Sequence, residues 1–410
     1  MASSTLSNVT YALSSHYAGA SLLSSFDFFT GDDRSNGFVN YLDENSAMAH
    51  GLVSVQEGNH VRLGVDSTTV LSTNDTGRPS VMLTSRDSFT HGLFIADFEH
   101  MPASSCGSWP SFWAFNNNTD AWPKGGEIGI VEGANNAIRN LYSAHTDSGC
   151  ALPEGGFLGS QGSEQCDSQK GQIGCNYAAP ARDPTSYGDA FNAAGGGVYA
   201  LEWDDEFLKM WHFPRAGVPA DIQVGRPQPS GWGLPHALFG GSGCDADTYF
   251  YNMSLVLNIN FCGNYAGGLW RETESCGKLA STCEAYVAGH PEAYTEAYWD
   301  VRYIDVYQKK VPRAKSDSRP DSSSPRPSAR PQLAAHNVLT KTVTLSKAPA
   351  PTTGPLGLKT IGRYVLLGCF ESDDGYPTFD EAMNSTSMTN SMCISKCTAA
   401  GKRYSGVQAE

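Results

Sequence analysis

Short segments in which β-branched and aromatic residues alternate with polar ones recur along this 410-residue chain, and no other pattern limits its fold as strongly. Clusters of Gly, Asn, Asp or Pro separate these segments, an arrangement typical of β-strands. Helical periodicity is confined to one stretch around residues 275–290. So many short strands predict an all-β fold, a large two-sheet β-jelly-roll sandwich. The clearest strand-like segments are residues 60–66, 80–85, 92–100, 195–204, 206–213 and 251–261.

The net charge of the chain argues against some classes of binding partner. There are 28 Lys+Arg against 42 Asp+Glu, a formal charge of −14. A surface that binds nucleic acid needs clustered basic residues, so we expect no nucleic-acid partner. No stretch approaches the roughly 20 apolar residues of a membrane span, so we expect no membrane span. We expect the chain to be a monomer.

Basic residues and prolines divide the chain into three parts. Residues 312–362 hold eight Lys/Arg, two Asp/Glu and eight of the 22 prolines, with no aromatic residue. This composition predicts an extended, disordered linker. Residues 1–311 hold the remaining strand-like segments, with 16 basic and 34 acidic residues, and form the predicted globular domain. Residues 363–410 form a small segment that contains cysteine.

The eleven cysteines predict disulfides and therefore export to an oxidising, extracellular compartment. Eight lie in residues 1–311, enough for four disulfides whose connectivity the sequence leaves open, and three lie in residues 363–410. None has the paired spacing with histidines of a zinc site, so we expect no metal. The first residues lack the basic and apolar regions of a signal peptide, so we expect the leader to be missing. Five glycosylation sequons fit a secreted protein: Asn8, Asn74, Asn117, Asn252 and Asn384.

One segment carries charges suited to catalysis. In GGEIGIVEG, residues 125–133, two glutamates alternate with apolar residues in a chain that has only 17% charged residues. Strict alternation places Glu127 and Gly129 on one face of a strand and Glu132 on the other. A single β-bulge would return Glu132 to the face of Glu127 and allow the close carboxyl pair of a retaining glycosidase. Two solvent-facing glutamates on an edge strand are the alternative.

Tryptophans gather beside this segment. Three of the eight tryptophans, Trp109, Trp113 and Trp122, lie within 14 residues of one another. A single tryptophan more often packs in a core, but exposed indole faces also offer apolar contact to sugar rings. Their concentration next to paired carboxylates favours a sugar-binding cleft.

These segments resemble glycoside hydrolase family 16, in particular its fungal endo-1,3(4)-β-glucanases, or laminarinases. The resemblance covers almost all of residues 1–311 and includes FDFFTGDD, GFVNYLD, CGSWPSFW, GEIGIVEG, AHTDSGC, GGGVYALEW and AYWDVRYIDVYQ. It implies a concanavalin-like two-sheet jelly roll and a retaining, double-displacement mechanism. It makes Glu127 the nucleophile and Glu132 the acid and then the base. Four further residues match positions in or beside the family's cleft, which are Trp113, Trp122, His145 and Trp270.

The family motif Glu-x-Asp-x-x-Glu is altered here, because Gly129 replaces the aspartate. In the family this aspartate lies between the glutamates and hydrogen-bonds the nucleophile. Its absence perturbs coupled carboxyl groups, so we expect activity to be attenuated, on the order of 10²–10⁴ in rate. Met82 in place of a cleft arginine and Asn264-Tyr265 in place of Asp-Trp are further departures.

Residues 363–410 resemble the beginning of a WSC domain, a module associated with cell-wall polysaccharide. The resemblance rests on the segment from Tyr364 to Phe370, on Cys393 and Cys397, and on Gly406-Val407. Because the family's further cysteines would follow, we expect a truncated carbohydrate-binding module, which explains the odd number of cysteines.

The sequence therefore predicts a secreted glycoside hydrolase without a cofactor, a retaining endo-1,3(4)-β-glucanase whose partner is β-glucan polysaccharide or oligosaccharide. The alternative is a catalytically silent protein that binds β-glucan or the cell wall, as Gly129 and the other substitutions suggest. A third candidate is a transglycosylase, in which a sugar instead of water intercepts the glycosyl-enzyme.

Overall fold

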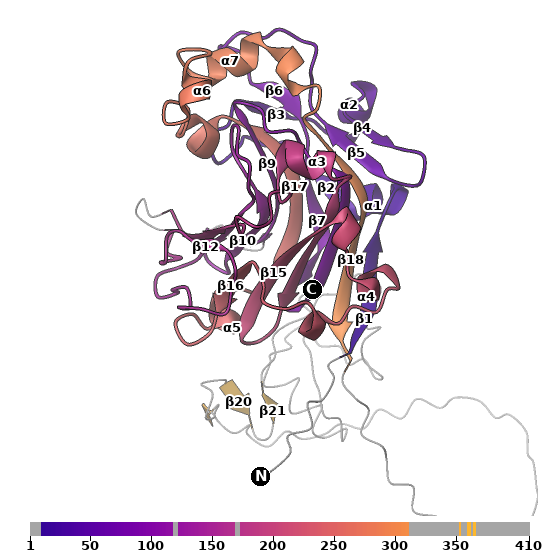
Figure 1. The fold of residues 1–410 in the computed structure, drawn as a ribbon, viewed down its shortest axis with the longest axis vertical. Coiled ribbons are helices and arrows are strands. Elements are labelled where there is room, and N and C mark those ends of the chain that lie inside the picture. The colour runs from indigo at the N-terminus through magenta and orange to yellow at the C-terminus, as the bar shows by residue number, and fades with distance from the viewer. Residues whose placement is uncertain are drawn as a thin grey trace, which may run out of the picture. The chain divides into compact units, whose positions relative to one another are not determined.

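The computed structural model describes residues 10–117, 122–168 and 173–310, together with the backbone of residues 352–353, 359–361 and 364–365. The chain divides into two units, Met1–Ser316 and Asp317–Glu410. The first contains two large antiparallel sheets (Figure 1). In the second, three short strands form a small sheet: β19 (Thr352–Thr353), β20 (Lys359–Ile361) and β21 (Tyr364–Val365). The rest of the predicted linker and the cysteines of the WSC-like segment lie outside the described residues.

The first large sheet has eight strands in the order β16-β15-β14-β8-β18-β5-β4, with β1 paired to β18 beside this path. Its strands are β1 (Tyr11–Tyr17), β4 (Val53–Val55), β5 (Val61–Gly64), β8 (Gly92–His100), β14 (Gly197–Trp203), β15 (Phe207–Pro214), β16 (Ala237–Gly240) and β18 (Tyr298–Lys309).

The second large sheet also has eight strands, in the order β12-β13-β11-β10-β9-β17-β7-β2. Its strands are β2 (Phe26–Phe28), β7 (Met82–Phe89), β9 (Ser108–Asn116), β10 (Glu127–Glu132), β11 (Leu141–His145), β12 (Ser160–Gln161), β13 (Cys175–Ala178) and β17 (Met253–Phe261). A separate parallel pair joins β3 (Val39–Tyr41) to β6 (Arg78–Ser80).

All six segments predicted as strands are strands, namely β5, β7, β8, β14, β15 and β17. The prediction of an all-β, two-sheet sandwich is confirmed. The stretch at 275–290 forms two short helices, α6 (Glu274–Gly277) and α7 (Cys283–Gly289), instead of one. The second helix starts afresh because the Thr282 side chain caps it, accepting a hydrogen bond from the backbone N–H of Ala285.

The other helices are short and join strands. The α-helices are α1 (Ala20–Ser25), α2 (Glu44–Ala49), α3 (Gly188–Ala193), α4 (Ala220–Gln223) and α5 (Ala246–Tyr249). The 3₁₀ turns are η1 (Arg215–Gly217), η2 (Pro229–Gly231) and η4 (Pro291–Tyr294), and η3 (Gly263–Gly267) is a π-helical turn.

The central strand of the first sheet, β8, is buried on both faces. Phe94, Ala96 and Phe98 face the core between the sheets. Leu93 and Ile95 face the other way, into a second apolar cluster that Trp211 and Ile222 help to cover. This double burial is why β8 reads as a nearly continuous apolar run.

The second sheet packs one face against the core between the sheets. In β9, Phe112 and Ala114 enter the core between the sheets. The alternate residues Ser111, Trp113 and Phe115 therefore lie on the opposite face. That face carries the candidate site.

All eight cysteines of the first unit form disulfides. Their pairing, which the sequence left open, is Cys106–Cys276, Cys150–Cys244, Cys166–Cys175 and Cys262–Cys283. Cys106–Cys276 and Cys262–Cys283 join the ends of β9 and β17 to α6 and α7, and Cys166–Cys175 joins β13 to the loop before it.

Candidate active site

A glycine pair sets the start of the strand that carries both glutamates. Gly125 and Gly126 adopt φ angles of 80° and 82°, which other residues rarely adopt. A Cβ at Gly126 would lie 2.5 Å from the backbone oxygen of Tyr249, so a side chain is excluded there by space as well. The chain turns at this pair and enters β10 with Glu127 as the first residue.

A β-bulge in β10 brings the two glutamates to the same face. Glu127 pairs with Phe115 and Glu132 with Ser111 on β9, and the register shifts between Gly129 and Val131. Because β9 pairs without a shift to its other neighbour, β17, Phe115 and Ser111 lie on one face. Their partners Glu127 and Glu132 share that face. The register confirms the bulge predicted from the spacing of the glutamates.

Asn140, which precedes β11, holds the bulged backbone. Its amide Nδ2 donates to the carbonyl of Ile130 at 2.9 Å, and its Oδ1 accepts from the backbone N–H of Glu132 at 2.9 Å. The pairing of β10 with β11 runs only from Glu127 to Gly129, so Asn140 provides bonds that a regular ladder would have made. Its side chain is fully buried.

The Glu127 carboxylate lies between an indole and an imidazole. The Trp122 indole N–H donates to Glu127 Oε2 at 2.8 Å. His145 Nε2, on β11, lies 3.9 Å from Glu127 Oε1. The Trp122 and His145 rings are also neighbours, with centroids 5.8 Å apart. Two residues predicted to line the cleft thus lie against the predicted nucleophile.

The Glu132 carboxylate accepts a hydrogen bond at each oxygen. The Trp109 indole N–H donates to Oε1 at 3.1 Å, and the Ser143 hydroxyl donates to Oε2 at 2.8 Å. Tyr265 packs edge-on against the Trp109 ring, with centroids 5.4 Å apart. Glu132 is thereby held by two elements, β9 and β11, and η3 supports the Trp109 ring.

Burial raises the pKa of both carboxyl groups. It raises the pKa of Glu127 to about 7, and the Trp122 hydrogen bond opposes this rise. Burial also raises the pKa of Glu132; the interactions with His145, Ser143 and Trp109 oppose the rise, whereas the charge of Glu127 adds to it. Burial lowers the pKa of His145, which favours its neutral form. When Glu127 is ionised, its charge therefore helps Glu132 to retain a proton.

Trp113 lies on the same face as the glutamates, opposite Gly129. Its indole N–H donates to Asn258 Oδ1 at 2.9 Å, and Asn258 in turn donates to the Tyr41 hydroxyl at 3.1 Å. The indole of Trp122 is 48% exposed. Both indoles are held by a hydrogen bond, and Trp122 in addition leaves part of its surface exposed.

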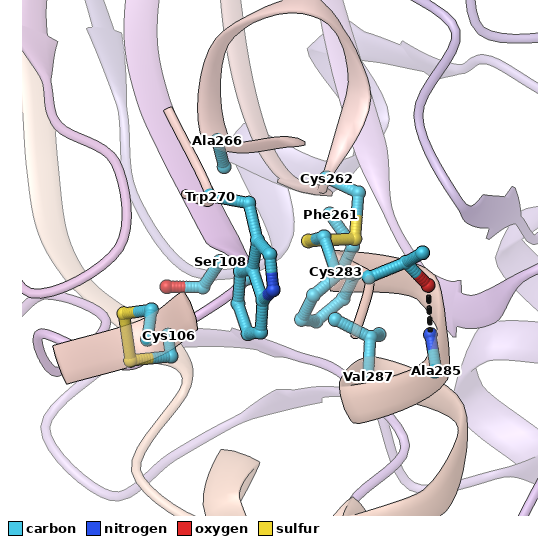
Figure 2. The surroundings of a disulfide bond; sticks show 12 residues. Cys106, Ser108, Phe261, Cys262, Ala266, Trp270, Cys283, Ala285 and Val287 are labelled. Atoms are coloured by element: carbon cyan, nitrogen blue, oxygen red, sulfur yellow. Dashed lines mark hydrogen bonds between the residues drawn. A yellow bond between two sulfur atoms is a disulfide. The ribbon is translucent and has the colours of Figure 1, made fainter. Parts of the chain in front are cut away.

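Trp270 differs from the prediction that it lines the cleft. Its side chain is 3% exposed, and its indole N–H donates to the backbone oxygen of Ala280 at 3.1 Å. Figure 2 shows the ring between the disulfide of Cys106 and the disulfide that joins Cys262 to Cys283. A ring buried in this way has no face for a sugar, so we assign Trp270 to the core.

Sequence reasoning placed Trp109 among the tryptophans of a sugar-binding cleft but missed its contact with Glu132, and it missed Ser143 altogether. Trp109 occurs in the quoted CGSWPSFW segment and lies four residues before Trp113, which on a strand is the same face. That spacing could have identified it. Ser143 lies two residues before His145 and shares its face, but a serine carries no comparable signal.

The described ranges contain neither a metal-binding cluster nor a membrane-spanning helix. Among residues 10–117, 122–168 and 173–310, no group of three or more His, Cys, Asp or Glu side chains could hold a metal ion. No helix in the described part of the chain is long and apolar enough to cross a membrane.

Two carboxylates on one strand face, beside indole rings in a β-sandwich, are features of enzymes that cleave glycosides. Comparison with family models agrees with this class. The chain belongs to glycoside hydrolase family 16, since the model described as the XgeA-like, catalytic GH16 domain matches residues 26–307.

The chain is similar to curated fungal proteins. It is 40% identical over 309 residues to the endo-1,3(4)-β-glucanase of Arthroderma benhamiae, an alignment that covers 74% of this chain and 66% of that protein. It is also 40% identical over 313 residues to a probable endo-1,3(4)-β-glucanase of Aspergillus niger, covering 75% of this chain and 41% of that protein. The chain thus spans less than two thirds of the length of these relatives.

Two solved structures share the fold. One is described as an elongating GH family 16 β-1,3-glucosyltransferase and has 41% identity and a TM-score of 0.68, covering 73% of this chain and all of that chain. The other is Laminarinase 16A from Phanerochaete chrysosporium with β-glucans in its donor and acceptor sites, at 36% identity and a TM-score of 0.67 with the same coverage. These similarities confirm the predicted jelly-roll fold class.

Proposed function

We propose that this chain is a retaining endo-1,3(4)-β-glucanase that hydrolyses β-glucan by double displacement. The observation that carries the proposal is the bulge in β10, which places Glu127 and Glu132 on one face. The names of the curated relatives support the substrate class. The partly exposed indole of Trp122 supports a sugar as ligand, since its ring can cover the apolar face of a glucose unit.

Each glutamate has one role in the first step. The ionised Glu127 attacks the anomeric carbon, while Glu132 donates its proton to the glycosidic oxygen. The bond from the anomeric carbon to that oxygen breaks, and a glycosyl-enzyme ester forms on Glu127. In the second step, the Glu132 carboxylate takes a proton from water, the resulting hydroxide attacks the anomeric carbon, and Glu127 is released.

The two carboxyl groups have different hydrogen-bond partners. Glu132 has two neutral hydrogen-bond donors, Trp109 and Ser143, that stabilise its carboxylate after it has lost its proton. Glu127 accepts one hydrogen bond, from Trp122, and keeps its other oxygen next to His145. Glu127 therefore has fewer hydrogen-bond donors than Glu132, and its role as nucleophile rests on its match to the family motif and not on these donors.

The absence of a side chain at Gly129 is the basis for expecting attenuated activity. A catalytically silent β-glucan-binding protein remains the alternative, in which the cleft binds the polymer but does not cleave it. The two glutamates and their donors argue for catalysis, because a site that only bound sugar would gain nothing from burying two carboxyl groups.

One observation favours a second catalytic outcome. The glucosyltransferase of family 16, at 41% identity, is described as an elongating enzyme. In transfer, a sugar hydroxyl replaces water in the second step, and the same two glutamates act. Longer products from a laminari-oligosaccharide, visible by mass spectrometry, would identify this outcome.

We further propose that the protein is exported and acts outside the cell as a monomer. The four disulfides of the first unit support export, because such bonds persist in oxidising compartments. The WSC-like segment would add a second contact to cell-wall polysaccharide.

The test is reducing-sugar release from laminarin by the full chain. We expect Glu132→Gln to reduce the rate by about 10²–10⁴-fold, and Glu127→Gln to reduce it at least as much, because the nucleophile is lost. Glu57→Gln, at an exposed position between β4 and β5, should behave like wild type. If wild type releases no more sugar than Glu127→Gln, the protein is not a hydrolase, and the binding alternative holds if it still retains β-glucan.

A further inference from the structure

Ser143 donates a hydrogen bond to Glu132, the predicted acid/base, and lies beside Gly129, which has no side chain. Its hydroxyl donates to Glu132 Oε2 at 2.8 Å. On the sheet, Ser143 is the direct cross-strand partner of Gly129. The side chain is 5% exposed, so water does not replace the hydroxyl freely.

The space above Gly129 is what lets this hydroxyl reach Glu132. A Cβ on Gly129 would lie 2.3 Å from Ser143 Oγ and 3.1 Å from Glu132 Oε2. The first distance is far below van der Waals contact, so any side chain at 129 forces the hydroxyl to turn away. Ser143 Oγ thus occupies the place in which a side chain at 129 would begin.

The backbone does not explain the glycine. Gly129 lies inside β10, and its φ lies outside the left-handed region that only glycine adopts easily. A substitution here meets the Ser143 hydroxyl and not a backbone restriction. Glycine at 129 and serine at 143 are therefore matched to each other.

We propose that Ser143 is a positioning residue for Glu132, and that Gly129 is the partner that makes room for it. The hydroxyl fixes one carboxyl oxygen while the Trp109 indole fixes the other, so that Glu132 is held in one orientation toward the glycosidic oxygen. This inference rests on the proposed function, because it assigns Ser143 a part in that reaction.

The Ser143 hydroxyl is a neutral donor and affects the pKa of Glu132. The charged and titratable groups that face Glu132 are Glu127 on β10, His145 on β11, Tyr265 on η3 and Tyr187 before α3. A hydroxyl adds no further negative charge to this group. It stabilises the ionised form of Glu132, and its removal should raise the pKa of that carboxyl.

The test compares kcat on laminarin for the full chain and four variants. Ser143→Ala should lower kcat by about 10–100-fold, the range expected for one hydrogen bond to a charged group, with KM changed less than about twofold. Ser143→Thr, which keeps the hydroxyl, should restore most of kcat. Gly129→Ala should lower kcat as much as Ser143→Ala, and the double variant no further, because both changes remove the same bond.

A pH profile separates positioning from a merely structural role. In the pH profile of kcat, the fall at high pH (the basic limb) reports loss of the proton from Glu132. Ser143→Ala should therefore move this basic limb to higher pH. Ser85→Ala is the matched control: this serine is 3% exposed in β7, and its hydroxyl bonds only backbone groups. It should lower stability but leave the basic limb in place.

Two results would overturn the inference while the proposed function stands. One is a Ser143→Ala enzyme with kcat within about twofold of wild type and an unmoved basic limb. The other is a double variant whose loss is the product of the two single losses. If wild type equals Glu127→Gln, the proposed function itself fails, and this inference fails with it.

Discussion

Among the individual residues, Trp122 has two roles that can be separated: it presents an exposed ring, and it donates to Glu127. Removal of the donor should raise the pKa of Glu127 further, because the indole hydrogen bond opposes the effect of burial. Since Glu127 must lose its proton to attack, kcat/KM should rise with pH through about 7 in wild type. In Trp122→Phe, this acidic limb should move to higher pH.

The control for this prediction is Trp232→Phe. That indole also donates to a carboxylate, Asp221, at 2.9 Å, but it belongs to the cluster on the outer face of the first sheet. Its loss should leave the pH profile of kcat/KM unchanged. An acidic limb that stays in place in Trp122→Phe would show that Trp122 does not set the ionisation of Glu127.

Gly129 itself can be tested with a carboxyl group. Gly129→Asp alone should have little benefit or lower the rate, because the new Cβ meets Ser143 Oγ at 2.3 Å. Gly129→Asp combined with Ser143→Ala removes this collision and should be more active than either single variant, on the order of tenfold. The measurement is kcat on laminarin. A single Gly129→Asp variant that exceeds the double one would contradict the account.

At the level of strands, the bulge in β10 depends on Asn140. We expect Asn140→Ala to lower the free energy of unfolding by about 2–4 kcal/mol, since two buried backbone groups lose their partner. The rate on laminarin should fall as well, because Glu132 lies at the end of the bulge. Urea denaturation and reducing-sugar release measure the two effects. Asn136→Ala removes an exposed amide hydrogen bond to Ser275 and is the control.

If Asn140→Ala unfolds like wild type, the bulge does not depend on this side chain. If it loses stability but keeps the full rate, the bulge does not position Glu132. Either result would contradict the assigned role of Asn140.

The spacing of the glutamates showed that a shared face requires a bulge, but neither that the bulge forms nor what stabilises it. Alternation has a period of two, so two glutamates five apart can share a face only if one residue is extra. Asn140 and Ser143 could not be predicted in the same way. Their contacts depend on the register between β10 and β11, which one sequence does not specify.

Across the whole first unit, the disulfides differ in what their loss should change. Cys106–Cys276 closes a separation of 170 residues and Cys166–Cys175 one of only 9. In the chain-entropy description, removal of the first pair lowers stability by about 5 kcal/mol and of the second by about 2.5 kcal/mol. Denaturation of the two double Cys→Ser variants measures this difference.

Among variants that remain folded, loss of Cys166–Cys175 should lower activity more than loss of Cys106–Cys276, the reverse of the order expected for stability. Cys166–Cys175 lies beside the site, since the Ser168 hydroxyl is 2.8 Å from His145 Nδ1 and the carbonyl of Cys166 accepts from Thr146. Its loss should lower kcat/KM more than the loss of Cys106–Cys276. Equal stability losses for the two pairs would contradict the chain-entropy argument.

The fold of the first unit could largely be predicted from the sequence, but the position of Trp270 could not. Alternating segments define strands locally, and the structure bears out all six. Whether an aromatic ring faces a cleft or a core depends on what packs over it. For Trp270 these neighbours are Tyr286 and the two disulfides, which only the folded chain brings together.

The central claim is that Glu127 and Glu132 carry out a double displacement from one strand face. The most direct test is proton NMR of the first sugar released from laminarin, before mutarotation. Retaining enzymes place the two carboxyl groups about 5–5.5 Å apart and inverting enzymes about 6.5–9.5 Å apart, so the anomer reports the geometry of the pair. We predict that the β-anomer appears first. Initial release of the α-anomer would contradict the account.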